Sequence, residues 1–249
     1  MSNKRAFVTG ASEGIGRALC GQLVAQGWSV VGLARSRERL ESLKQELGES
    51  FSFEVADLSS TEEMDRVAVL VGEGGFDLLV NNAGFGVYGD FFEVPLERYR
   101  NMLRVNVEAL VVLSHAYLAR AKRGDALVNV SSVLAFLPMP TGGLYSATKA
   151  LVTSLSESLW FQGRERGVFV MSFCPGPTET LFHERTGGQT QKMPSFMMQT
   201  PEQVAARIIA AVKARRKPTV ISGGKNAMLS SVHRYLSRRA LVNMMGKRV

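Results

Sequence analysis

Hydrophobic positions along the chain alternate between short β-branched runs and longer stretches in which apolar residues recur every three or four positions. The short runs predict strands at 6–9, 28–34, 52–56, 76–80, 126–131, 168–173 and 218–222. The longer stretches predict helices at 15–26, 37–47, 62–71, 95–121, 144–164 and 202–214. The strands show little internal alternation, as strands buried on both faces of a parallel sheet do. We therefore expect a doubly wound α/β fold with about seven strands.

Composition and length fit one globular domain. The chain has 249 residues, of which 45% are hydrophobic and 21% charged. These values exclude a disordered, collagen-like or disulfide-scaffold protein. We find no linker and no internal repeat, and therefore expect a single domain over 1–249, with a basic, helix-like tail over 223–249.

The formal net charge of +8 is unevenly distributed. Residues after Glu202 include eleven basic and no acidic residues, whereas 1–202 carry nineteen basic and twenty-two acidic ones. The main part of the chain has no basic patch interleaved with aromatic residues, so we expect no nucleic-acid partner. In the tail, apolar residues lie near helical spacing at Leu229, Val232, Leu236 and Met245. Such a helix suits an anionic membrane surface, an acidic partner, a subunit contact or plain solvent exposure.

Cysteine and histidine usage argues against disulfides and metal. Cys20 and Cys174 lie far apart and are expected to be buried as small hydrophobic residues. The three histidines, His115, His183 and His233, are too widely separated to suggest a zinc site. No apolar run reaches the length of a membrane span, and the start of the chain does not resemble a signal peptide. We expect a cytoplasmic protein.

A glycine-rich loop joins the first predicted strand to the first helix. In Gly10-Ala11-Ser12-Glu13-Gly14-Ile15-Gly16, the glycines permit a tight turn and a close approach of a pyrophosphate to the backbone at a helix N-terminus. The same residues match GxSxG, the nucleophile elbow of hydrolases, but that motif follows several strands and is accompanied by an HGGG-type loop, which this chain lacks. The loop therefore predicts a Rossmann-like dinucleotide site, although a purely structural turn stays open.

The end of the second strand indicates which dinucleotide binds. NAD-dependent enzymes place an acidic residue there, but this chain has Arg35 and Arg37. Guanidinium groups suit the 2′-phosphate of NADP(H), and Ser12 adds a hydroxyl. Glu13 is unfavourable beside phosphates, and the two arginines have the alternative role of solvating a helix start. We predict NADP(H).

Tyr145 and Lys149 have the i, i+4 spacing that places a phenol and an ammonium on one helix face. Ser132 ends the fifth strand, and Asn106 lies inside the long helix. Each of these residues alone has an ordinary structural explanation, such as a helix cap or a surface amide. Their joint occurrence, with Asn81-Asn82-Ala83-Gly84 after the fourth strand, indicates an active site.

The order of these motifs resembles the short-chain dehydrogenase/reductase family over residues 4–222. The resemblance implies a nicotinamide-dependent oxidoreductase with the catalytic residues Asn106, Ser132, Tyr145 and Lys149. It also implies that Asp57 bonds adenine, for which a helix cap is the competing interpretation. The expected cofactor-binding residues are Gly10, Ser12, Gly14, Ile15, Gly16, Arg35, Arg37, Asp57, Asn82, Ala83, Gly84, Tyr145, Lys149, Pro175, Gly176, Thr178 and Thr180.

The expected chemistry centres on a phenol, whose ordinary pKa is about 10. Lys149 and the oxidised nicotinamide would lower the pKa of Tyr145, which would protonate the developing alkoxide. Ser132 would hold the carbonyl oxygen, and Asn106 would position a water that links Lys149 to solvent.

Residues 181–200 correspond to the family's substrate lid. They are rich in Met and Phe, and the expected pocket rim is also apolar, with Phe85, Val87, Tyr88 and Leu134 among its members. Flexible apolar side chains suit a hydrophobic ketone or aldehyde, including an acyl or lipid-like one, and its alcohol. The alternatives are that these residues merely seal the lid, and that the protein is an NADP(H)-binding sensor or scaffold without turnover. The resemblance further implies a homodimer or homotetramer, and an acyl carrier protein as one acidic partner for the tail.

Overall fold

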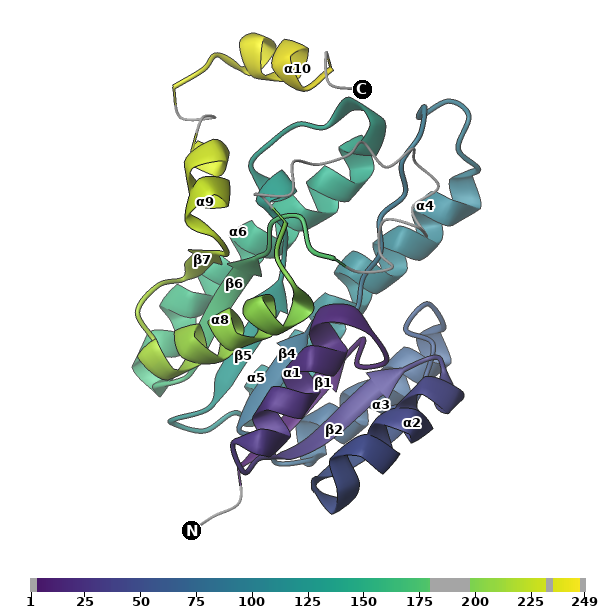
Figure 1. Ribbon diagram of the computed structural model, residues 1–249, viewed down its shortest axis with the longest axis vertical. Coiled ribbons are helices and arrows are strands. Elements are labelled where there is room, and N and C mark those ends of the chain that lie inside the picture. The colour runs from purple at the N-terminus through teal and green to yellow at the C-terminus, as the bar shows by residue number, and fades with distance from the viewer. Residues whose placement is uncertain (1–3, 180–197, 232–234, 247–249) are drawn as a thin grey trace.

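A parallel β-sheet forms the centre of the computed structural model, which describes residues 4–179, 198–231 and 235–246 (Figure 1). Within these residues the strand order is β3-β2-β1-β4-β5-β6-β7, and every neighbouring pair is parallel. The strands are β1 Arg5–Thr9, β2 Ser29–Ala34, β3 Phe51–Val55, β4 Leu78–Asn81, β5 Ala126–Val130, β6 Phe169–Cys174 and β7 Thr219–Ile221. The predicted doubly wound, Rossmann-like fold is confirmed.

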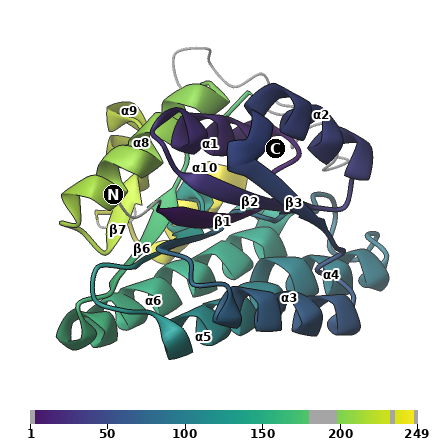
Figure 2. The same cartoon turned by 90° about the horizontal axis from the view of Figure 1, so that it is seen from below.

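Helices cover both faces of the sheet. One layer contains α1 Gly14–Ala25, α2 Arg37–Leu47 and α8 Pro201–Ala214. The other contains α3 Thr61–Glu73, α4 Leu96–Leu103, α5 Leu110–Arg120 and α6 Gly143–Arg166. Figure 2 shows the sheet between these two layers. The tail adds α9 Gly224–Ser231 and α10 Arg238–Gly246 beyond the last strand.

The two faces of the sheet bury two separate apolar clusters. Along β1, Ala6 and Val8 belong to the cluster under α1 and α8, whereas Phe7 belongs to the cluster under α3 and α5. All three side chains are fully buried. Because both faces are covered, apolar residues occupy successive positions, which explains why the strands show no alternation in the sequence.

The long helix predicted over 95–121 is confirmed as a continuous helical stretch, Leu96–Arg120, but it is not α-helical throughout. A π-helical segment, η2 Arg104–Ala109, separates α4 from α5. π-Helical turns inside α-helices commonly mark functional sites. The segment contains Asn106, whose side chain is bonded to the loop after β4. The organisation of the chain as one domain stays a prediction.

The tail folds back onto the chain. Leu241 and Met245 of α10 pack against Leu137, which follows β5. Leu236 is 38% exposed, and Val232 and the side chain of Leu229 lie outside the described residues. In Figure 1, α9 and α10 lie beyond the end of the sheet opposite to the N-terminus. Part of the apolar side of the tail is therefore already covered within the chain.

One helical stretch in the described part of the chain, Leu96–Arg120, is long and apolar enough by length and composition to cross a membrane. Its mean hydropathy is 1.2, and 39% of the window is buried. Leu113 and Tyr117 in this stretch pack into the cluster under α3 and α5. The core helices of soluble proteins meet the same criteria, so the stretch is weak evidence for a membrane span.

Helix α3 offers a direct test of this packing. Val67 is fully buried, whereas Val69 in the same helix is 59% exposed. Val67→Ala removes two buried methyl groups and should lower the free energy of unfolding by about 2 kcal/mol. Val69→Ala should change it by less than about 0.5 kcal/mol. Urea unfolding followed by circular dichroism measures both, and equal losses would contradict the orientation of α3.

Candidate active site

The predicted site residues gather at the carboxyl ends of the parallel strands. The glycine loop follows β1, Arg35 and Arg37 follow β2, Asp57 follows β3, and Asn82-Ala83-Gly84 follow β4. Ser132 follows β5, and Pro175, Gly176 and Thr178 follow β6. Thr180 and most of the expected lid, 180–197, lie outside the described residues. In open α/β sheets, ligands bind at this edge, next to the strands where the order reverses.

The glycine loop is held against β4 by Asn82. The Asn82 Nδ2 donates to the carbonyl oxygens of Thr9 and Gly10, at 2.9 and 3.3 Å. A Cβ on Gly16 would lie 2.2 Å from the Gly10 carbonyl oxygen, and Gly10 has a φ of +69°. Only glycine is compatible with both positions. Asn82, which the resemblance places beside adenosine, therefore also fixes the shape of the loop.

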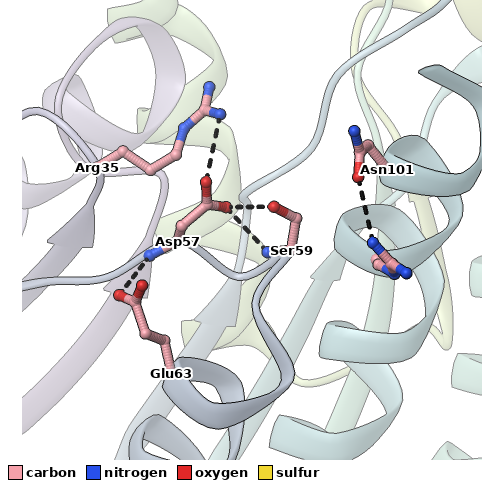
Figure 3. A network of polar contacts seen from close by, with 6 residues as sticks. Arg35, Asp57, Ser59, Glu63 and Asn101 are labelled. Atoms are coloured by element: carbon pink, nitrogen blue, oxygen red, sulfur yellow. Dashed lines mark hydrogen bonds and ion pairs between the residues drawn. The ribbon is translucent and has the colours of Figure 1, made fainter. Parts of the chain in front are cut away.

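The adenosine end of the predicted site contains an ordered polar network (Figure 3). Asp57 Oδ1 accepts from the backbone N–H and the hydroxyl of Ser59, at 2.9 and 2.8 Å. Arg35 Nη1 lies 3.8 Å from Asp57 Oδ2. Burial opposes ionisation of Asp57, but the hydrogen bonds from Ser59 and the charge of Arg35 outweigh it and lower the pKa of this carboxyl. The N-cap of α3 is Ser60, so Asp57 forms a turn before the cap and is not itself the cap residue.

Arg39 is a site residue that the sequence reasoning missed. Its guanidinium forms an ion pair with the carboxylate of Glu13 in the glycine loop. Glu13 looked unfavourable beside phosphates, and this pairing offsets its charge locally. Arg37 instead lies 3.8 Å from Glu41 on its own helix. The sequence signal for Arg39 as a site residue was its position, because it lies in the first turn of α2, shortly after β2.

Two of the predicted catalytic residues lie on α6 and one at the end of β5. Lys149 Nζ lies 5.8 Å from the centre of the Tyr145 ring and donates to the Val130 carbonyl oxygen at 2.9 Å. Ser132 forms a side-chain hydrogen bond with Tyr145, and its Oγ accepts from the Leu134 N–H at 3.1 Å. Ser132 is thus both the N-cap of the short helix η3 Val133–Ala135 and a neighbour of the phenol.

Asn106 is fixed by two hydrogen bonds to one residue. Its Oδ1 accepts from the Phe85 N–H at 3.0 Å, and its Nδ2 donates to the Phe85 carbonyl oxygen at 2.9 Å. A Cβ on Gly84 would lie 3.0 Å from Asn106 Oδ1 and 3.4 Å from Lys149 Nζ. The absence of a side chain at Gly84 therefore allows Asn106, Lys149 and the loop after β4 to come together.

Burial dominates the protonation of the phenol and the ammonium. It raises the pKa of Tyr145, with a smaller contribution from Tyr88, while the hydrogen bond with Ser132 opposes the rise. It also lowers the pKa of Lys149 to about 8. In the cofactor-free chain the pKa of Tyr145 is thus raised, because loss of solvation is the largest influence on the phenol. The expected lowering includes the charge of a bound oxidised nicotinamide and stays a prediction.

A chain of buried hydroxyl groups lies behind the site and was missed by the sequence reasoning. Ser131 Oγ donates to the Lys149 carbonyl oxygen at 2.7 Å and contacts Thr153 Oγ1 at 2.8 Å. Thr153 continues to Ser172 Oγ at 3.1 Å. Cys174, buried as expected, lies at the end of this chain. Polar residues inside apolar strands were the available signal, since each needs a buried partner.

Tyr145 belongs to an apolar cluster. Val87, Tyr99 and Met102 are buried in it, and the rings of Tyr88 and Tyr145 lie 5.8 Å apart. Members of the predicted rim that pack against the cluster are Phe85, Tyr88, Leu134 and Leu144. The sequence prediction of an apolar surrounding for Tyr145 is in agreement with this packing.

The residues present fit a dinucleotide. The crowding at Gly10 and Gly16 forms a backbone cradle at the N-terminus of α1, as pyrophosphate binding requires. The carboxylate of Asp57 and the small residues Ala83 and Gly84 suit adenosine, and the Lys149 ammonium beside Gly84 is a donor that would suit a ribose hydroxyl.

Three comparisons with known proteins agree with this arrangement. Residues 4–190 match the family model described as short chain dehydrogenase. The chain is 36% identical to serine 3-dehydrogenase of Agrobacterium fabrum over 191 residues, which is 74% of this chain and 76% of that protein. It is 29% identical to 7beta-hydroxysteroid dehydrogenase of Mediterraneibacter gnavus over 236 residues, covering 91% and 88% of the two chains.

The fold also matches that of a solved structure with bound cofactor. A short-chain dehydrogenase from Sphingobium yanoikuyae in complex with NADPH superimposes with a TM-score of 0.83 at 26% identity. The match covers 93% of this chain and 94% of that one.

The buried lysine should make stability depend on pH in a specific direction. An unfolded chain keeps Lys149 protonated up to about pH 10.5, whereas the folded chain releases this proton at about 8. Between these values the unfolded state binds more protons, so the free energy of unfolding rises with pH. The difference between wild type and Lys149→Met should therefore grow by about 3 kcal/mol from pH 8 to 10.5.

Urea unfolding of the cofactor-free proteins at four pH values within this window measures the effect. Lys213→Met, at an exposed position of α8, is the matched control and should show no such trend. A constant difference between wild type and Lys149→Met would contradict the lowered pKa.

Proposed function

Because the chain belongs to the short-chain dehydrogenase/reductase family, we propose that it interconverts a hydrophobic ketone or aldehyde and its alcohol with NADP(H). The family membership establishes a nicotinamide-dependent oxidoreductase. The observation that carries the proposal is the convergence of Tyr145, Ser132 and Lys149 on the sheet edge that also holds the glycine loop.

Each residue has a distinct part in the proposed reaction. The nicotinamide, when bound, supplies or accepts the hydride. The Tyr145 hydroxyl gives its proton to the substrate oxygen during reduction and takes it back during oxidation. The Ser132 hydroxyl donates a hydrogen bond to the same oxygen and stabilises its growing negative charge. Lys149 holds the ribose, and its ammonium favours the phenolate that remains after proton transfer.

The raised pKa of Tyr145 supports the role of proton donor. A phenol that stays neutral over the physiological range holds the proton that reduction consumes. The bonds of Asn106 to Phe85 fix the turn of η2 beside Lys149. A relay through Asn106 from Lys149 to solvent stays part of the proposal.

The preference for NADP(H) rests on charge and exposure after β2. The side chains of Arg35 and Arg37 are 69% and 67% exposed, and both stand at the N-terminus of α2, where Ser36 is the N-cap. An anion is favoured at such a helix end, and two guanidinium groups strengthen the site. The pairing of Arg39 with Glu13 further supports it, because it reduces the repulsion of a phosphate.

The hydrophobic substrate is supported by the cluster of Tyr88, Val87 and Leu134 around Tyr145. The names of the two relatives differ widely, since one is a serine dehydrogenase and the other a hydroxysteroid dehydrogenase. Family membership therefore leaves the substrate open, and an acyl or lipid-like carbonyl is proposed from the apolar residues alone.

The oligomeric state of the protein and the partners of its tail are proposed from exposed residues. Apolar side chains are exposed on helices α4, α5 and α6, at Leu96, Leu103, Val111, Leu151 and Phe161. They support a homodimer or homotetramer that forms through these helices. A cytoplasmic location stays a prediction. Contact of the tail with an anionic membrane or an acidic carrier also stays a prediction, and the exposed Arg238 and Arg239 on α10 favour it.

The reaction is tested with NADPH and a panel of ketones, aldehydes and acyl substrates, followed by the absorbance of the reduced nicotinamide. Tyr145→Phe should bind NADPH as wild type does and lose roughly a hundredfold to ten-thousandfold in kcat, because the proton donor is removed. Tyr235→Phe, at a residue that is 85% exposed, is the control and should be unaffected. Activity of Tyr145→Phe within tenfold of wild type would exclude the proposed acid.

The cofactor preference is tested separately. The double variant Arg35→Ala/Arg37→Ala should lower kcat/KM for NADPH by roughly tenfold or more and leave kcat/KM for NADH nearly unchanged, because only NADPH carries the 2′-phosphate. Arg207→Ala/Lys213→Ala, which removes two exposed charges from α8, is the matched control. Equal kcat/KM values of the wild type for the two cofactors would overturn the preference.

A further inference from the structure

Asn226 is a buried polar residue in the tail, and it lies against the loop after β6. Asn226 is only 3% exposed, although it lies in the tail, after the last strand of the sheet. A Cβ on Gly176 would lie 2.0 Å from the Asn226 Nδ2 and 2.5 Å from its Cγ. The Asn226 carboxamide therefore packs directly on the backbone of Gly176, at a distance that only glycine permits.

One hydrogen bond holds the carboxamide in this place, since the Asn226 Nδ2 donates to the Ser222 carbonyl oxygen at 3.1 Å. The Ser230 hydroxyl donates to the backbone carbonyl oxygen of Asn226 at 2.7 Å and so holds the helix backbone at this residue. The Ser222 N–H in turn donates to the Cys174 carbonyl oxygen at 2.9 Å, immediately before Pro175. The Asn226 side chain is thus connected through Ser222 to the end of β6.

The loop that Asn226 contacts is connected to the predicted catalytic serine. The Pro175 carbonyl oxygen accepts from the N–H of Val133, the residue after Ser132, at 3.1 Å. The Gly176 carbonyl oxygen accepts from the Thr178 hydroxyl at 2.9 Å. A shift of Gly176 would therefore be transmitted both to the loop and to the backbone beside Ser132.

The region around Asn226 contains buried polar atoms that lower the free energy of unfolding. Asn226 Oδ1, Ser222 Oγ and Gln199 Oε1 are buried and have no hydrogen-bond partner among the described residues. A buried polar group without a partner costs about 1–3 kcal/mol. A residue that served only to pack α9 against the sheet would be better replaced by an apolar one. The polar side chain at this position is more consistent with a role in the site.

We propose that Asn226 is a positioning residue for the nicotinamide end of the cofactor. It presses on Gly176 and holds the loop from Pro175 to Thr178 where the nicotinamide would bind, and it makes α9 of the tail a part of the active site. The inference rests on the proposed function and on the family resemblance, which implies that Pro175, Gly176 and Thr178 bind the cofactor. The hydrogen bond from Val133 to Pro175 places this loop beside Ser132, where the reactive nicotinamide end would lie.

A pair of ligands separates positioning from a general structural effect. NADPH contains the nicotinamide, whereas 2′-phospho-ADP-ribose is the same molecule without that ring. Asn226→Ala should raise the Kd of NADPH by roughly tenfold, about 1.4 kcal/mol of binding free energy, because the nicotinamide loop is no longer fixed. The Kd of 2′-phospho-ADP-ribose should stay within twofold, which also shows that the variant is folded.

Isothermal titration calorimetry measures both constants and needs no turnover. Asn243→Ala, at an exposed asparagine of α10, is the control and should leave both constants unchanged. Equal weakening of the two ligands by Asn226→Ala, or weakening of neither, would overturn the inference. A wild type that binds NADPH but reduces no carbonyl would instead contradict the proposed function, and the two failures are thereby distinguished.

A double-mutant cycle tests the contact itself. Gly176→Ala places a methyl group within 2.0 Å of the Asn226 carboxamide and should weaken NADPH binding strongly. In Gly176→Ala/Asn226→Ala the three nearest clashing atoms, all of the carboxamide, are gone, so NADPH binding should recover relative to Gly176→Ala. Additive losses would show that the two residues act independently and would contradict the inference.

Discussion

Hydrogen bonds between Thr9 and Asn82 join the two strands at which the sheet reverses its order. Thr9 Oγ1 accepts from the N–H groups of Asn82 and Ala83, both at 2.9 Å, and the Asn82 side chain returns a bond to the Thr9 carbonyl oxygen at 2.9 Å. The glycine loop starts at this point, and so does the loop that leads to Gly84. The shape of the cofactor cradle and the placement of Asn106 and Lys149 beside Gly84 both depend on this connection.

The catalytic edge of the sheet combines polar chemistry with deep burial. Lys149 is 5% exposed, and its ammonium donates a hydrogen bond to the carbonyl oxygen of Val130. Burial lowers the pKa of the lysine to about 8 and raises that of the neighbouring Tyr145, so burial disfavours the charged forms of both groups in the cofactor-free site. A negatively charged substrate oxygen would reverse part of this effect, because it stabilises the ammonium. The site is therefore suited to a proton transfer that accompanies the appearance of negative charge.

The C-terminal tail is connected to this edge at two places. Asn226 of α9 packs on Gly176, and Leu241 and Met245 of α10 pack on Leu137, beyond Ser132. Both contacts involve segments that follow strands β5 and β6, which carry predicted catalytic and nicotinamide-binding residues. The basic residues of the tail that the structure describes, Lys225, Arg238 and Arg239, are exposed to solvent, whereas its apolar residues Leu241 and Met245 face the chain.

The sequence by itself determined the doubly wound sheet and the glycine loop, because residue spacing and apolar runs report local geometry. The joint occurrence of Tyr145, Lys149 and Ser132 indicated a site, and the resemblance to a known family added their catalytic roles. The tertiary structure decided what depends on partners distant in the chain: the ion pair of Arg39 with Glu13, the raised pKa of Tyr145, the π-helical segment at Asn106, and the contact of Asn226 with Gly176. These features arise from burial and close approach between segments that are distant in the sequence, so residue spacing alone does not specify them.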